Sequence, residues 1–195
     1  MKKLVSVLTA LALSLSMCSA LAEISALPAY TYQGEDPVMA AVVKYMQETD
    51  FGFEPADGGV LIPTPIILRT EVNEDGDKAA VYGNFWIFTY TLEGRTLMTG
   101  PCGENPGVIR LEKKDDIWRA ADAEFAEEGT YNESIVRFAN GDKQLENDYR
   151  RTTDNSDESF LPQYQRNVLV EYVNANSLDI TAYQDYGQDP VDLVK

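Results

Sequence analysis

Residues 78–92 read KAAVYGNFWIFTYTL, and this stretch decides the fold of the chain. Aromatic and β-branched residues at this density are typical of a β-strand. Side chains alternate between the two faces of a strand, so every second residue shares a face. The aromatic residues brought to one face in this way are Tyr82, Trp86, Phe88 and Tyr90. The stretch therefore predicts a long strand with one aromatic side.

Turn residues divide the neighbouring sequence into further strands. Glu93-Gly94 predicts a tight hairpin, and Lys114-Asp115-Asp116 predicts a second turn. The other strands are expected over residues 60–72, 95–99, 108–113 and 117–126, with a Gly/Pro-rich loop at 99–107 interrupting the return strand. Pro63 and Pro65 cannot donate to a ladder, so the first half of strand 60–72 is expected at an edge or a bulge. Together these segments predict a curved antiparallel four-strand meander.

Helical patterns lie on both sides of the meander. Asp36-Pro37 suits a helix start, since Asp caps free amides and Pro fits the first helical position. Thr130 and Glu133 have the spacing of a capping box. Helices are expected over residues 37–48, 131–139, 142–151 and 161–173, with a short strand over 178–183. The predicted fold class is α+β, with the N-terminal helix packed on the meander and the other helices following it.

The first 22 residues predict export. Lys2 and Lys3 precede an apolar run from Leu4 to Met17, and Ala20-Leu21-Ala22 has the small-x-small pattern of a cleavage site. We expect cleavage after Ala22 and a secreted or envelope-associated, extracytoplasmic protein from a bacterium. The alternative is a lipid anchor on Cys18, although Met17 stands where that motif takes Gly or Ala. No later stretch is long enough to predict a membrane span in the mature chain.

The charge balance excludes some partners. The chain has 16 basic and 32 acidic residues, for a net charge of −16. A nucleic-acid partner is not expected, because binding phosphate requires a basic stripe. An anionic membrane surface is disfavoured for the same reason. The acidity is typical of a protein kept soluble outside the cell.

The residue inventory predicts no metal site and no cofactor. The chain has no histidine and 2 cysteines, which removes the usual zinc and copper ligand sets. Asn73, Asp75 and Asp77 alternate like calcium ligands, but Lys78 follows where that loop takes glycine, so a hairpin turn is favoured. Cys102 lies in the Gly/Pro-rich loop without a histidine base, and we interpret it as a bystander thiol. No nucleotide-binding or nucleophile-elbow motif occurs.

Four residues are candidates for a ligand site. Tyr82, Trp86 and Tyr90, on the aromatic face, could stack on a ligand. The competing interpretation is a core face packed on helix 37–48, with Trp86 or Phe88 against Val42 and Tyr45. Asp122 would act as a general base if its strand face lined a cavity, whereas a solvent-facing strand is the alternative. No catalytic residue is assigned.

The layout resembles a known superfamily. The residues that carry the likeness are the helix VMAAVVKYM at 38–46, the strand end TYTLEG, and GVIRLEKKDDIW at 107–118. Their order resembles secreted bacterial members of the nuclear transport factor 2-like family, with a cystatin-like α+β cone. The resemblance implies a cone-like domain at 36–130. The leader, turn and helix patterns themselves predict a signal peptide at 1–22, a mature N-terminal linker at 23–35, and a helical C-terminal extension at 131–195 packed on that domain.

The same resemblance sets the functional expectations. The superfamily includes isomerases and dehydratases as well as catalytically inert binding domains. Its His-Asp pairs cannot exist in a chain without histidine. We expect a non-enzymatic domain that binds a small ligand or an envelope protein. The alternatives are a small isomerase or hydrolase that uses a pocket carboxylate such as Asp122 with a tyrosine, and a structural domain that homodimerises through its aromatic face.

Overall fold

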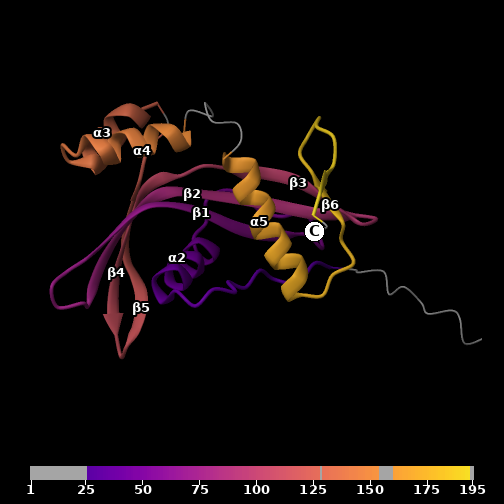
Figure 1. Cartoon of the computed structure of the whole chain (residues 1–195), viewed down its shortest axis with the longest axis horizontal. Coiled ribbons are helices and arrows are strands. Elements are labelled where there is room, and N and C mark those ends of the chain that lie inside the picture. Colours follow the sequence, from indigo (N-terminus) through magenta and orange to yellow (C-terminus); the bar gives the residue numbers. More distant parts are fainter. Residues whose placement is uncertain (1–25, 128, 154–159, 194–195) are drawn as a thin grey trace, which may run out of the picture.

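The computed structural model describes residues 26–127, 129–153 and 160–193, so the predicted leader and Cys18 lie outside the described residues. The protein is α+β, as predicted. The described residues form four helices and a seven-stranded sheet in place of the expected four-strand meander (Figure 1). The helices are α2 (Pro37–Glu48), α3 (Tyr131–Ala139), α4 (Lys143–Thr153) and α5 (Phe160–Ala175). The strands are β1 (Val60–Val72), β2 (Lys78–Glu93), β3 (Thr96–Gly103), β4 (Pro106–Lys114), β5 (Ile117–Phe125), β6 (Ala182–Gln184) and β7 (Val191–Asp192).

β2 is the long central strand of the sheet, and one of its edges is shared between two partners. β1 pairs along the other edge, from Ala79 to Tyr90. On the shared edge, β4 pairs with residues 78–84 and β3 pairs with β2 from Ile87 onward. Asn105 closes the fork, because its carbonyl accepts from the Phe85 amide and its side-chain amide donates to the Phe85 carbonyl, both at 3.1 Å. The fork lets one strand organise two arms of the sheet.

β1 confirms the expected edge strand. Among the described strands it pairs with β2 alone, and its register shifts between Ile67 and Arg69. Pro63 and Pro65 lie opposite Ile87 and Phe85 in this pairing. A proline edge has no amide to offer to another strand, so it discourages pairing with a second chain.

The Gly/Pro-rich segment is strand and not the predicted loop. β3 continues to Gly103, with a register shift between Phe88 and Tyr90, and two residues separate it from β4. The Thr89 hydroxyl donates to the Pro101 carbonyl at 2.8 Å. A Cβ on Gly100 would lie 2.7 Å from that hydroxyl oxygen, so glycine is needed for the close approach.

The expected contact of Trp86 or Phe88 with Val42 and Tyr45 is wrong. Helix α2 packs on the opposite face of β2, where Val42 and Met46 join Phe85 and Ile87 in one buried cluster. Phe88 and Tyr90 are buried instead beneath α5. The alternation of β2 defines two apolar faces, but local sequence does not say which helix covers which face.

Helices α3 and α4 cover the remaining end of the aromatic face. Phe138, Leu145 and Tyr149 cluster with Val108 of β4. The expected capping box at Thr130 does not form, because the Thr130 hydroxyl donates to the Glu127 carbonyl and caps no helix amide. Asp142 does cap its helix, accepting from the amides of Gln144 and Leu145 at 2.9 and 3.0 Å.

The C-terminal part returns to the sheet after α5. β6 pairs parallel with β3, and β7 pairs antiparallel with β6. The predicted strand over 178–183 therefore forms later and shorter, at Ala182–Gln184. None of the helices in the described ranges is long and apolar enough to cross a membrane.

Candidate functional site

Two of the candidate ligand residues lie beneath α5. Tyr90 is 1% exposed, and its hydroxyl accepts a 2.9 Å hydrogen bond from the Gln165 side chain. Burial holds the pKa of Tyr90 well above its usual value. Trp86 is half-buried and stacks on Phe88, with ring centroids 5.6 Å apart. These residues form core, and the aromatic face is not an open platform.

The other two candidates lie around Arg110, at the far end of β2. Tyr82 donates to a Glu71 carboxylate oxygen at 3.4 Å. Asp122 pairs with Arg110 at 2.7 Å, and its side chain is 63% exposed. Asp122 is thus the solvent-facing, ion-paired carboxylate of the alternative interpretation. The structure does not bring it together with Trp86 and Tyr90.

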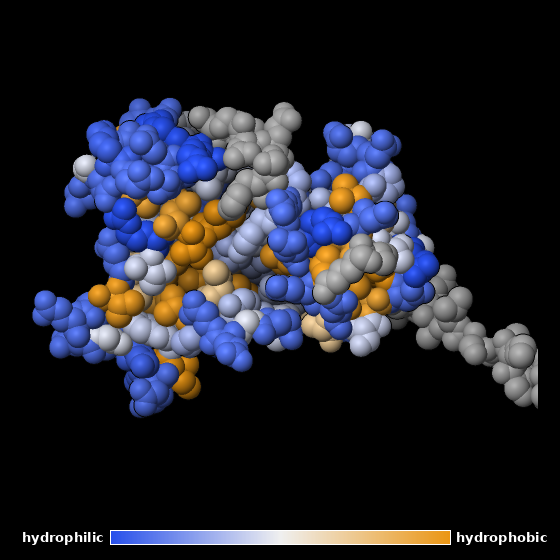
Figure 2. All heavy atoms as spheres, in the orientation of Figure 1, coloured by the Kyte–Doolittle hydropathy of each residue, from blue (hydrophilic) through white to orange (hydrophobic). Residues whose placement is uncertain are grey.

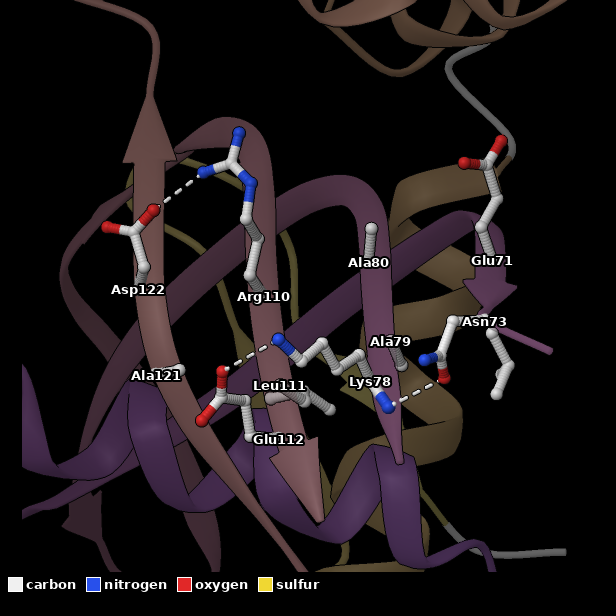
Figure 3. Close-up of a pocket in the computed structure, with 11 residues that line it drawn as sticks. Glu71, Asn73, Lys78, Ala79, Ala80, Arg110, Leu111, Glu112, Ala121 and Asp122 are labelled. Carbon is white, nitrogen blue, oxygen red and sulfur yellow. Dashed lines mark hydrogen bonds and ion pairs between the residues drawn. The ribbon is translucent and has the colours of Figure 1, made fainter. Parts of the chain in front are cut away.

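A shallow furrow of about 510 Å³ runs past this cluster. Figure 3 shows small side chains in it, including Ala79, Ala80 and Ala121, with charged side chains around them. The charges already pair with one another, Arg110 with Asp122 and Lys78 with Glu112 at 3.6 Å. An exposed surface whose charges are matched offers little to a charged ligand.

A second hollow, of about 530 Å³, is lined by residues of α5, β1 and α2 and of the segment before α2. Figure 2 shows an apolar area on this side of the molecule between the α3–α4 pair and α5, and none of the described residues of α3 or α4 lines the second hollow. We name the second hollow the tyrosine groove. Its lining comes from the segment before α2 and from α2, β1 and α5, and comprises Tyr30, Tyr32, Gln33, Gly34, Met39, Val43, Pro63, Pro65, Tyr164, Asn167, Val168 and Glu171.

Hydrogen bonds between distant segments build the groove. The Tyr164 hydroxyl on α5 donates to the Pro65 carbonyl of β1 at 2.9 Å. Tyr172 donates to the Pro28 carbonyl at 2.8 Å, and the Gln47 side chain donates to the Tyr30 carbonyl at 2.8 Å. The segment before α2 is thereby tied to both helices, and the walls of the groove are fixed in the free protein.

The polar groups of the groove lie close enough to influence one another. Burial, then the carboxylate of Glu171 and the hydroxyls of Tyr164 and Tyr32, raise the pKa of Tyr30 to about 12. The pKa of Tyr164 is raised by burial and then by Glu171 and Tyr32. Within the described residues, Glu171 forms no ion pair and the Tyr30 hydroxyl no hydrogen bond. The groove therefore holds a carboxylate and a hydroxyl that the fold leaves unused.

Sequence reasoning missed this groove. Tyr30 and Tyr32 lie in the predicted linker 23–35, and Tyr164 lies in the helix expected over residues 161–173. The one local signal was the Pro63/Pro65 edge, which marks a strand side that no further strand covers. Nothing local indicates that α5 returns to that edge.

The suspected calcium turn is a hairpin held by its own side chains. The Asn73 side-chain oxygen accepts from the amides of Asp77 and Lys78, and its amide donates to the Asp77 carboxylate at 2.7 Å. Across residues 26–127, 129–153 and 160–193, no three Cys, Asp or Glu side chains gather in a way that could hold a metal ion.

Cys102 is an exposed free cysteine. Partial burial of its thiol is the larger cause of its raised pKa, and the negative charge of Asp185 is the smaller cause.

Comparison with known proteins identifies no family. No family model and no curated protein matches the chain. One solved structure, the intermembrane space region of the chloroplast protein ARC6, aligns with 11% identity over 46% of this chain and 84% of its own. Its TM-score is 0.25, too low to carry an argument about fold or function. The resemblance to the nuclear transport factor 2-like family stays a prediction.

Proposed function

We propose that this chain is a non-enzymatic binding domain and that the tyrosine groove takes a small organic ligand. The observation that carries the proposal is the groove itself, about 530 Å³ in size with walls fixed by hydrogen bonds between α5, β1 and the segment before α2. Small-molecule sites are typically ~300–1,000 Å³, mostly apolar, and carry a few placed polar groups. Met39, Val43 and Val168 supply apolar walls here, and the tyrosines and Glu171 supply the polar groups.

Chemistry by a tyrosine and a carboxylate is the weaker alternative. Tyr30 and Glu171 lie near each other, but a pKa of about 12 moves the Tyr30 hydroxyl further from the range useful for acid–base catalysis. Glu171 is exposed.

Homodimerisation through the aromatic face is also disfavoured, because Phe88 and Tyr90 are 4% and 1% exposed within one chain.

A substitution that fills the tyrosine groove tests the binding function. Asn167 is exposed and lines the groove, so Asn167→Trp would block it without disturbing the core. Ala121→Trp is the matched control, since Ala121 is exposed and lines the charged furrow. We expect ligand-observed NMR with a fragment library to find binders that Asn167→Trp loses and Ala121→Trp keeps. Binders that ignore Asn167→Trp, or an absence of binders, would refute the proposal.

We further infer that the binding domain works outside the cytoplasm. The support is the leader pattern at residues 1–22 and the acidity of the chain. Intact-mass analysis of the protein expressed in a bacterial host is expected to give a mature form that begins at Glu23. A form that begins at Cys18 with added acyl mass would establish the lipoprotein alternative instead, and an uncleaved chain would refute export.

A further inference from the structure

We propose that the tyrosine groove selects organic cations, in particular a small molecule that carries a substituted ammonium group. The inference rests on the proposed binding function and names its ligand class. Its basis is the combination of aromatic rings with one carboxylate that forms no ion pair in the part of the chain that the structure describes.

Charge is the first argument. Among the described residues that line the groove, Glu171 is the only one with a charged side chain. Among the described residues no Lys or Arg lies within ion-pair distance of it. Asp36 adds negative potential, since after burial it is the next cause of the raised pKa of Tyr32. In a chain with a net charge of −16, the groove attracts cations and repels anions.

The aromatic lining is the second argument. Tyr30, Tyr32 and Tyr164 come from two segments and line the same groove as Glu171, whose carboxylate contributes to the raised pKa of each. The Tyr164 hydroxyl is tied to the Pro65 carbonyl, and the Asp36 backbone bonds to the Tyr32 hydroxyl. Both side chains line the groove and are half-buried, so part of each remains accessible to a ligand. Ring faces attract cations, and aromatic cages bind quaternary ammonium groups in this way.

The same lining disfavours other occupants. A calcium ion takes ~6–8 oxygen ligands, and the lining that the structure describes provides one carboxylate. A neutral sugar could bond to Gln33 and Asn167, but it would leave the charge of Glu171 without a counter-ion. A cation with methyl substituents matches both the rings and the apolar walls formed by Met39 and Val168.

Choline and its uncharged carbon analogue, in which a tert-butyl group replaces trimethylammonium, test the charge preference directly. We expect choline to shift the NMR signals of the groove in the mature protein and to bind roughly 3- to 30-fold more tightly than the analogue. Glu171→Gln should remove most of the preference for choline over its uncharged analogue. Glu48→Gln, an equal charge loss at an exposed helix position outside the groove, should leave it intact.

Two ring variants test the aromatic contribution. Tyr32 is half-buried, so its replacement is compatible with folding. We expect Tyr32→Phe to keep choline binding and Tyr32→Leu to weaken it several-fold. Equal affinity for choline and its analogue, or no binding of choline, would overturn the cation proposal. The binding function would survive that result if Asn167→Trp still removed other fragments, and would fail with it if Asn167→Trp removed none.

Discussion

Gln165 on α5 donates a 2.9 Å hydrogen bond to the hydroxyl of Tyr90 on β2, and these residues are 3% and 1% exposed. The same Gln165 amide nitrogen lies 3.3 Å from a carboxylate oxygen of Asp185. Asp185 also accepts a 2.6 Å hydrogen bond from Thr99 on β3. One buried amide thus joins α5 to the centre of the sheet and to the loop after β6, which fixes the helix that forms one wall of the tyrosine groove.

Removing the Gln165 side-chain amide should lower the free energy of unfolding more than removing the Tyr90 hydroxyl does. Gln165→Leu leaves the Tyr90 hydroxyl buried without a partner, for an expected loss of about 1–3 kcal/mol of unfolding free energy. Tyr90→Phe should cost about 0.5–1.5 kcal/mol, because Gln165 keeps Asp185 as a partner. Urea unfolding measures both. The double variant should lose less than the two single losses together, and strict additivity would contradict the pairing.

The two faces of β2 should respond differently to truncation. Phe85 is 0% exposed beneath α2, so Phe85→Ala is expected to cost about 3–5 kcal/mol. Trp86→Ala should cost less, because the ring is only half-buried. Val72→Ala, at a residue 52% exposed, serves as a control and should change stability by less than about 0.5 kcal/mol. A larger loss for Trp86→Ala than for Phe85→Ala would contradict the assignment of the faces.

The elements that the sequence predicts correctly are those with local causes. Helix α2 begins at Pro37 because the Asp36 carboxylate accepts from the amides of Val38 and Met39 at 2.8 and 3.3 Å. The Asp115-Asp116 turn forms as predicted, with positive φ at both residues, a conformation that Asp tolerates better than most residues. Caps and turns depend on a few neighbouring residues, so a single sequence is enough to find them.

The candidate site depends on contacts between residues far apart in the chain. The Tyr164 hydroxyl and the Pro65 carbonyl are separated by 99 positions, and Tyr172 and the Pro28 carbonyl by 144. No local pattern specifies such pairs. For the same reason the alternation in β2 predicts two apolar faces but leaves open the choice between α2 and α5.

Cys102 should be a slow nucleophile. Partial burial and Asp185 raise the pKa of its thiol, so the reactive thiolate is scarce near neutral pH. We expect iodoacetamide to alkylate Cys102 more slowly than free cysteine, with the rate rising as the pH increases. Asp185→Asn should speed the reaction by removing a nearby negative charge. Alkylation faster than that of free cysteine would contradict the bystander interpretation.

Stability should change little between about pH 6 and 8 and should not respond to a chelator. The chain has no histidine, the side chain that ordinarily titrates in that range. Thermal melting across the range, with and without a chelator, provides the measurement. A melting temperature lowered by the chelator would reveal a metal site. A step in the melting temperature between about pH 6 and 8 would reveal a carboxyl group held out of water.

Alkaline pH should destabilise the protein through its buried tyrosines. Folding raises the pKa of Tyr30 to about 12, and that of Tyr172 also to about 12, above the value of about 10 in an unfolded chain. Below about pH 10 the folded and the unfolded chain both keep the hydroxyl protons of these two tyrosines, so the free energy of unfolding keeps its full value. Between about pH 10 and 12 the unfolded chain loses them first, so the free energy of unfolding falls as the pH rises.

Tyr30 lines the tyrosine groove, so the loss of stability at alkaline pH also reports on the groove. Tyr30→Phe should make the fall between about pH 10 and 12 shallower, because one proton fewer is held by the folded state. Glu171→Gln should lower the pKa of Tyr30 part of the way towards its usual value, since burial, the larger cause, remains. Tyrosinate absorbance, compared between Glu171→Gln and the control Glu48→Gln, measures that shift. Identical titrations of these two proteins would mean that the Glu171 carboxylate does not act on the groove, and the charge argument for an organic cation would fail with it.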